Sequence, residues 1–311
     1  VRSARAASLR RSLPRIDTHV HLWTPDTKTY PCDVEPPAQL NSDGRATHES
    51  FVQRMNEAGI TYAVVVQPIN YWQDYRYLKA ALAAHPSRLF GIFVADPTVP
   101  KDDAAEWLAR TARSDARYVG VRFNPYKWPE GGLGMADDTG VAMFRKAGEL
   151  GLVVGVMPFK GLARHMNEIE SLLQASPKTQ VIIDHWGFFL QPATGIGADR
   201  TVDEESWQSL LRLSVYPQVY VKVSAMFRVS TEGWPFVSLS ERLRMLLQRF
   251  GSDRLLWGSD FPFVTEHCEY RAAVRAIEDW PIWHDISEED RENIMGGTAA
   301  KLFGLPVPAP E

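Results

Sequence analysis

The stretch Ile16–Trp23, which reads IDTHVHLW, determines how the rest of the chain is interpreted. It has the composition of a short buried strand, and its end carries two histidines, His19 and His21. Because side chains on a strand alternate between faces, both imidazoles point to one side and Val20 points to the other. Two imidazoles at a strand end suit a metal ion or a polarised carbonyl oxygen. An H-x-H pair also arises by chance, so its meaning depends on residues far downstream.

Composition places the chain among ordinary globular proteins, with 311 residues of which 45% are hydrophobic and 23% charged. The formal charge of −4 gives no electrostatic case for nucleic-acid binding. No apolar run approaches the roughly 18 residues of a membrane span, so membrane insertion is not expected. Cys32 and Cys268 match no metal or redox spacing and are predicted to be free thiols.

Residues 1–15 differ from the rest, with five arginines, three serines and no acidic residue. They are predicted to form a flexible basic leader before a domain over residues 16–305, and residues 306–311 a short tail. Two interpretations of the leader stay open. One is a disordered segment of a cytoplasmic protein, and the other is the remnant of a chloroplast or mitochondrial transit peptide, which is rich in Arg and Ser and poor in acids.

Eight short apolar runs follow one another, as expected for parallel strands buried on both faces. They cover residues 16–23, 62–67, 89–95, 118–123, 152–157, 181–185, 219–224 and 255–260. Segments with helical periodicity lie between them, which gives β-α units of about 30 residues and predicts a single-domain (β/α)8 barrel. A doubly wound sheet is the competitor, but it would usually carry a glycine-rich fingerprint after an early strand, and none is present.

Functional side chains fall at the ends of these predicted strands, where barrel enzymes have their active sites. His185 ends the sixth run and Asp260 ends the eighth, so three histidines and an aspartate would meet on the barrel axis. Each has an ordinary alternative: His185 could be a hydrogen-bonded core residue, and Asp260 a helix N-cap. Their joint placement with His19 and His21 favours a catalytic cluster.

Several cations also fall at or just past strand ends, on a chain that is acidic overall. They are Arg122, Lys160, Lys222 and Arg228. Arginine binds carboxylates in a bidentate way, so these residues predict a small anionic organic substrate. The alternative is that they pair with acids, Arg122 and Lys222 with Asp184 or Asp260 in the interior and others at the rim. Asn124 shares a face with Arg122, and Tyr126 and Trp186 could line an apolar wall of the substrate site.

Three motifs together carry a family resemblance: Ile16–Trp23, Val181–Gly187 (VIIDHWG) and Trp257–Pro262 (WGSDFP). In this order they resemble the amidohydrolase superfamily, and more closely its amidohydrolase-2 branch. That branch includes sugar-lactone and pyrone-dicarboxylate lactonases and metal-dependent aromatic acid decarboxylases. The resemblance covers roughly residues 16–305. Two further segments, Val66–Asn70 and Val121–Tyr126, resemble plant and algal members of the branch.

The resemblance implies a role for each residue that matches these motifs. His19 and His21 would take the ligand positions of the first strand, and His185 the sixth-strand position that orients water or polarises the substrate. Asp260 would be the eighth-strand ligand and the general base, which takes a proton as water attacks a carbonyl.

Departures from the family pattern limit the metal site. Members with two metals bridge them with a carboxylated Lys or a Glu at the fourth strand, where this chain has Arg122. Decarboxylase members place a histidine at the end of the fifth strand, whereas His165 here lies further on and is expected to face solvent. One Zn²⁺ or Mn²⁺ held by His19, His21, His185 and Asp260 is compatible with the sequence. Metal-free catalysis, in which the histidines polarise the carbonyl, is equally compatible.

Three functions follow from these observations. The first is a hydrolase that opens a lactone or related cyclic ester or amide of an anionic substrate, with Asp260 activating water. The second is a metal-dependent, non-oxidative decarboxylase of an unsaturated or aromatic acid. The third is a non-catalytic barrel that binds a metabolite or a protein, against which the intact His-His-His-Asp set argues. A homodimer is also compatible with the fold.

Overall fold

The computed structural model describes residues 13–38, 43–129, 132–191 and 200–306. Most of the expected basic leader, and all of the expected C-terminal tail except residue 306, lie outside the described residues.

Eight parallel strands form one sheet, and their order follows the chain: β1-β2-β3-β4-β5-β6-β9-β10. They are Ile16–Val20 (β1), Tyr62–Val66 (β2), Leu89–Val94 (β3), Tyr118–Phe123 (β4), Val153–Val156 (β5), Val181–Ile183 (β6), Val219–Ser224 (β9) and Leu255–Gly258 (β10). The end of β1 returns to β10, since Val20 pairs with Phe261. The sheet therefore closes almost completely, and the predicted (β/α)8 barrel is confirmed, with a strand within each of the eight apolar runs.

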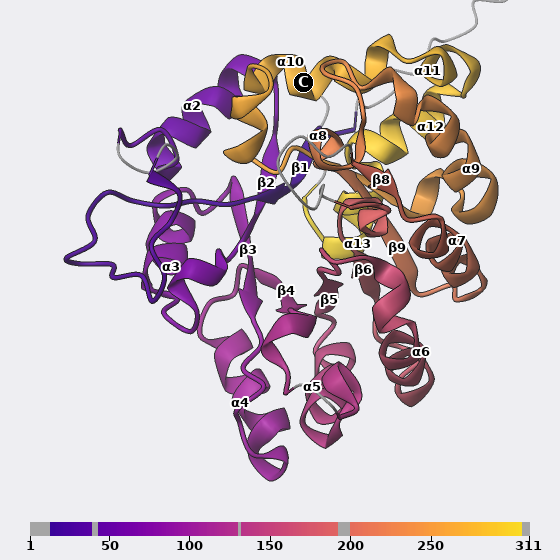
Figure 1. Ribbon diagram of the computed structural model, residues 1–311. Helices are drawn as coiled ribbons and strands as arrows, with labels where there is room; N and C mark the ends of the chain where they lie inside the picture. Colours follow the sequence, from indigo (N-terminus) through magenta and orange to yellow (C-terminus); the bar gives the residue numbers. More distant parts are fainter. Residues whose placement is uncertain (1–12, 39–42, 130–131, 192–199, 307–311) are drawn as a thin grey trace, which may run out of the picture.

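Helices surround this barrel and cover the outer face of its strands (Figure 1). The main ones are His48–Ala58 (α2), Arg76–Ala84 (α3), Lys101–Arg113 (α4), Asp138–Glu149 (α5), Met166–Ala175 (α6), Glu204–Arg212 (α7) and Ser240–Phe250 (α9). Shorter helices are Met226–Val229 (α8), Tyr270–Arg275 (α10), Pro281–Asp285 (α11), Glu288–Glu292 (α12) and Thr298–Phe303 (α13). No helix in the described ranges has both the length and the apolar character needed to cross a bilayer.

Local sequence explains where α2 begins and ends. The Thr47 side chain accepts a hydrogen bond from the Ser50 backbone N–H and so caps the first turn. Gly59 ends the helix with a φ of 72°, in the left-handed region that glycine enters without steric cost. The chain can then reverse and enter β2 within a few residues.

Apolar side chains form two clusters that leave one end of the barrel to polar groups. The larger cluster fills the layer between strands and helices. The smaller one includes Val64, Ile92 and Leu256 and packs against Phe303 of α13. Val64, Ile92 and Leu256 lie within strands, whereas His21, Asp184, His185 and Asp260 lie just beyond the strand ends. The apolar material thus supports one end of the barrel and leaves the other for chemistry.

Candidate active site

The ends of β1 and β10 are tied together, which places the histidine pair next to Asp260. The backbone N–H of His21 donates to the Phe261 carbonyl at 2.7 Å, and that of Asp260 donates to the His19 carbonyl at 2.9 Å. Both imidazoles are buried, and their Nε2 atoms lie 3.2 Å apart. His21 Nδ1 lies 2.8 Å from the Val66 carbonyl oxygen at the end of β2. The pair is thus held by three neighbouring strands.

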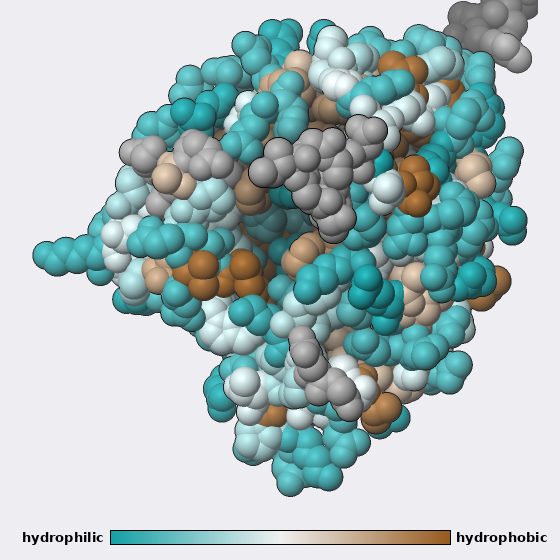
Figure 2. Space-filling view, in the orientation of Figure 1, coloured by the Kyte–Doolittle hydropathy of each residue, from teal (hydrophilic) through white to brown (hydrophobic). Residues whose placement is uncertain are grey.

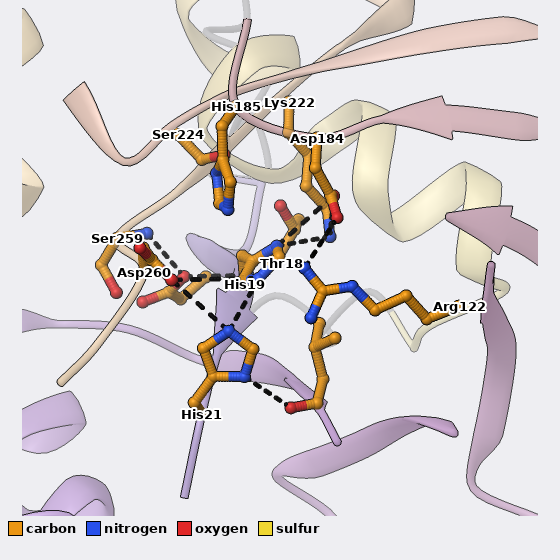
Figure 3. A network of polar contacts seen from close by, with 12 residues as sticks. Thr18, His19, His21, Arg122, Asp184, His185, Lys222, Ser224, Ser259 and Asp260 are labelled. Atoms are coloured by element: carbon orange, nitrogen blue, oxygen red, sulfur yellow. Dashed lines mark hydrogen bonds and ion pairs between the residues drawn. The ribbon is translucent and has the colours of Figure 1, made fainter. Parts of the chain in front are cut away.

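Three histidines and one aspartate, from three different strand ends, meet at one point (Figure 3). The Asp260 Oδ1 lies 3.5 Å from His21 Nε2 and 3.9 Å from His19 Nε2. The ring of His185 lies 4.4 Å from that of His19, centroid to centroid. The structure therefore brings His19, His21, His185 and Asp260 together, as strand-end placement predicts.

Backbone geometry at these strand ends is unusual. His185 has a φ of 50° and Asp260 a φ of 62°, both in the left-handed region that non-glycine residues rarely adopt. Trp186 and Phe188 also have positive φ, at 56° and 50°, so the chain turns sharply after β6. Such conformations cost of order 1–3 kcal/mol each and cluster at functional sites. Here they turn the His185 and Asp260 side chains into the barrel mouth.

A second buried carboxylate, Asp184, lies beside the histidines and is surrounded by cations. Its oxygens lie 3.3 Å from Lys222 Nζ, 3.3 Å from an Arg122 terminal nitrogen and 3.4 Å from His19 Nδ1. Burial alone would raise the pKa of Asp184, but Lys222 and Arg122 hold that pKa below its ordinary value. Asp184 is therefore a permanent anion that neutralises the cations around it.

Asp260 has a different environment. Its Oδ2 accepts a hydrogen bond of 2.7 Å from Arg228 Nε, and the Arg228 side chain is 33% exposed. Burial raises the pKa of Asp260, and Arg228 opposes this rise without cancelling it. The pKa values of the three histidines are shifted in the opposite direction. Burial lowers the pKa of His21 to about 3 and the pKa values of His19 and His185 well below the ordinary value. The rings are thus neutral at pH 7.

A cavity of about 220 Å³ opens over this cluster. Four of its lining residues are polar groups of the cluster, His21, Arg122, His185 and Asp260. The rest of the wall is mostly apolar and comprises Trp23, Pro68, Ile69, Asn70, Met157, Phe159, Phe188, Arg228 and Phe263. Figure 2 shows a hollow in the face that looks along the barrel, with hydrophobic residues at its edge. Ligand sites of about 300–1,000 Å³ bind drug-sized molecules, so this cavity fits a smaller one.

The structure distributes the six predicted substrate-binding residues unevenly. Arg122 lines the cavity, and its Nε is buried without a protein partner in the described chain. Lys222 is fully buried and pairs with Asp184. Its surroundings therefore match the alternative given above, a buried ion pair, and not a contact with substrate. Trp186 is also fully buried, with its ring 6.3 Å from that of Trp280, and is not among the cavity-lining residues. The sharp turn after β6 takes its side chain toward the helices.

The other three are connected to one another, and none of them is among the cavity-lining residues. Asn124 caps a short 3-10 helix by accepting a hydrogen bond from the Tyr126 backbone N–H. The Tyr126 hydroxyl accepts from the Lys160 backbone N–H at 2.8 Å, and the Lys160 ammonium lies 5.0 Å from the Tyr126 ring centroid. The expectation that His165 faces solvent is wrong. It is 9% exposed and its Nε2 lies 3.2 Å from the Tyr126 hydroxyl. The loop after β4 covers it, which helical periodicity cannot reveal.

Some site residues were not predicted as such from the sequence. The Ser224 hydroxyl lies 2.7 Å from His185 Nδ1 and fixes the orientation of that ring. Its position at the end of β9, two residues after Lys222, is the signal that could have identified it. Ile69, Met157, Phe159 and Phe188 line the cavity from loops just past strand ends, where sequence periodicity carries no information.

The donor set fits one divalent metal ion. His19, His185 and Asp260 each offer a ligand atom, and these atoms lie within 4.8 Å of one another. Two imidazoles and a carboxylate are ligands that zinc takes in catalytic sites, and His21 lies close enough to join them. A bound ion would act as a Lewis acid toward a carbonyl oxygen and lower the pKa of a bound water. With Arg122 at the end of β4, this strand offers no bridging ligand for a second ion.

Comparison with known proteins identifies the class. The amidohydrolase model Amidohydro_2 matches residues 16–305, and the chain belongs to this family. It is 24% identical over 307 residues to the L-fucono-1,5-lactonase of Burkholderia ambifaria, covering 95% of this chain and 97% of that protein. It is 26% identical over 312 residues to the 4-sulfomuconolactone hydrolase of Rhizobium radiobacter, covering 97% and 94%. The chain is thus an enzyme of lactonase type.

Solved structures agree with this class. A protein from Pseudomonas putida assigned as 2-pyrone-4,6-dicarboxylic acid hydrolase superposes with a TM-score of 0.73 at 25% identity, over 95% of this chain and 99% of its own. An amidohydrolase from Burkholderia multivorans with bound zinc has a TM-score of 0.72 at 20% identity, over 94% and 100%. The 2,6-dihydroxybenzoate decarboxylase from Rhizobium has a TM-score of 0.64 at 16% identity, over 95% and 99%. The last two likenesses concern the fold alone.

Proposed function

We propose that this protein hydrolyses a lactone, or a related cyclic ester or amide, of a small carboxylate-bearing molecule. The observation that carries the proposal is the position of Asp260. Its carboxylate is buried at the cavity wall, 3.5 Å from His21 Nε2, and Arg228 is the one Lys or Arg of the described residues that pairs with it. Its pKa is raised by burial, which makes it a stronger base than an exposed carboxylate. Lactone-hydrolysing relatives support the same reaction class.

In this mechanism Asp260 takes a proton from water while the water oxygen attacks the lactone carbonyl carbon. The carbonyl π electrons move to its oxygen, which an N–H group at the cavity wall stabilises. His185 offers Nε2–H there when Ser224 donates to its Nδ1. When the tetrahedral intermediate collapses, the ring C–O bond breaks. The leaving oxygen then takes the proton back from Asp260, which restores the carboxylate.

Substrate charge follows from Arg122. A buried Nε without a protein partner is costly, and a substrate carboxylate would satisfy it. The apolar wall formed by Trp23, Phe188 and Phe263 would contact the substrate ring. We therefore expect an anionic lactone to bind with its carboxylate toward Arg122 and its ester carbonyl toward Asp260.

The test is hydrolysis of a lactone panel by the purified protein, followed as proton release. The panel contains L-fucono-1,5-lactone, 4-sulfomuconolactone, 2-pyrone-4,6-dicarboxylate and a neutral γ-lactone, each with and without chelator. We expect turnover of at least one of the two anionic lactones above both uncharged ones, L-fucono-1,5-lactone and the γ-lactone. Thermal-shift measurements with the same panel report binding without turnover, since a ligand of the native state raises Tm. Stabilisation by lactones that are never hydrolysed would favour a non-catalytic binding barrel instead.

Decarboxylation is the second candidate. Such a reaction here needs a firmly bound metal ion, and the donor set of His19, His185 and Asp260 could hold one. Its test is metal analysis of the purified protein, followed by assay with unsaturated and aromatic acids. CO₂ release that stops with chelator and returns with Zn²⁺ or Mn²⁺ would support it. Chelator-insensitive activity would eliminate it.

A further inference from the structure

Lys222 is a buried cation to which the proposed reaction assigns no step. It lies in β9, only 1% of its residue surface is exposed, and it does not line the cavity. Its Nζ lies 3.3 Å from Asp184 Oδ1 and 3.1 Å from His19 Nδ1 (Figure 3). Asp184 already has Arg122 as a counter-ion. The contact with His19 is therefore the feature of Lys222 that calls for a function.

The proton on the neighbouring His21 can be located from its surroundings. Its Nδ1 lies 2.8 Å from the Val66 carbonyl oxygen, which can only accept a hydrogen bond. A neutral imidazole carries one proton, and in His21 this contact requires that proton on Nδ1. The Nε2 of His21 therefore presents a lone pair. This lone pair faces His19 Nε2 at 3.2 Å.

The proton on His19 can then be located from both sides of its ring. At Nδ1, the Lys222 ammonium can only donate, so this nitrogen accepts. At Nε2, two facing lone pairs would repel, so this nitrogen carries the hydrogen and donates to His21. A competing acceptor for an Nδ1–H exists in Asp184 Oδ1, but it lies further away, at 3.4 Å. The two contacts of His19 thus agree on one tautomer.

We propose that Lys222 is a positioning residue that holds His19 with its proton on Nε2. Hydrogen bonds then run in one direction, from Lys222 through His19 and His21 to the Val66 carbonyl. In this arrangement the His19 Nε2–H is donated to His21, and Nε2 has no lone pair for a metal. A zinc ion can use His19 only after the proton moves to Nδ1, where Asp184 would accept it and Lys222 would have to move aside.

The inference deepens the proposed function, because it assigns the protons of two histidines, His19 and His21, in the same site. Its test does not depend on that function, since it measures ring nitrogens and zinc binding, not turnover. Failure to hydrolyse lactones would leave it standing.

The first measurement is the ¹⁵N NMR spectrum of the chelator-treated wild-type protein, with His19 assigned by comparison with His19→Gln. The shifts of the two nitrogens distinguish which one is protonated. We expect a protonated Nε2 in the wild type and a larger fraction of protonated Nδ1 in Lys222→Met, because Asp184 can then accept from Nδ1 while His21 still favours Nε2–H. A protonated Nδ1 in the wild type would overturn the proposal, and this reading requires no variant of Lys222 to fold.

The second measurement is zinc affinity, by competition with a chromophoric chelator. Lys222→Met should bind zinc at least tenfold more tightly than the wild type. Arg122→Gln is the matched control, because it removes the same charge from beside Asp184 without contacting His19. If zinc affinity rose equally in both variants, simple charge repulsion would explain the rise, and Lys222 would have no role in setting the tautomer of His19.

Discussion

Two carboxylates in this barrel are equally buried and yet differ in their charged neighbours and in the direction of their pKa shifts. Asp184, which is not among the cavity-lining residues, is surrounded by Lys222, Arg122 and His19, and its pKa is lowered. Asp260, at the cavity wall, is bonded to Arg228 alone among the described cations within ion-pair distance, and its pKa is raised. Burial by itself penalises both anions, so the number of adjacent cations decides the outcome. Asp184 is suited to hold charges in place, and Asp260 to accept a proton.

The largest expected effect is on turnover. Asp260→Asn should lower kcat/KM for the best lactone about 10²–10⁴-fold, since a general base contributes about that factor. Because the amide keeps the shape of the side chain, Tm should change little. Kinetics and thermal unfolding of both proteins check this, with the exposed Asp102→Asn as the control. Full activity in folded Asp260→Asn protein would rule out this base.

Asp184→Asn should instead act mainly on stability. It leaves Lys222 and Arg122 buried without their shared anion, and breaking a buried pair from one side costs about 3–5 kcal/mol. Urea unfolding measures the loss. The comparison predicts a greater loss of stability for Asp184→Asn than for Asp260→Asn. Equal losses would contradict a structural role for Asp184 that Asp260 does not share.

Arg122→Gln should weaken binding of anionic substrates selectively. Loss of a bidentate charged contact should raise KM for a carboxylate-bearing lactone about 10-fold or more, corresponding to about 1.5–3 kcal/mol. A neutral lactone, measured with the same variant, is the internal control. If KM rose equally for both lactones, Arg122 would not be the anion anchor.

Arg228→Gln should give the smallest effect, a shift in pH dependence. Arg228 opposes the rise in the pKa of Asp260, so its removal lets that pKa rise further. The base works only when deprotonated, and the acid limb of kcat/KM should therefore move to higher pH. The profile is measured on chelator-treated protein so that metal does not contribute. A limb that moved to lower pH would contradict the charge assignment at the cavity wall.

Much of the fold follows directly from the sequence. Strands buried on both faces must be apolar along their length, and these runs are visible in the chain as separate segments. A strand's end marks the barrel mouth, which is why His19, His21, His185 and Asp260 could be grouped without coordinates.

Only the tertiary structure decided what each charged or aromatic residue touches. Lys222 and Arg122 look alike as strand-end cations, but the first is enclosed by Asp184 and His19 and the second reaches the cavity. Trp186 follows His185 directly, and yet a positive φ turns it toward Trp280. The physical reason is that sequence periodicity indicates only the face of a strand or helix on which a side chain lies. Depth along the barrel axis, and the partners met there, depend on segments that are remote in sequence.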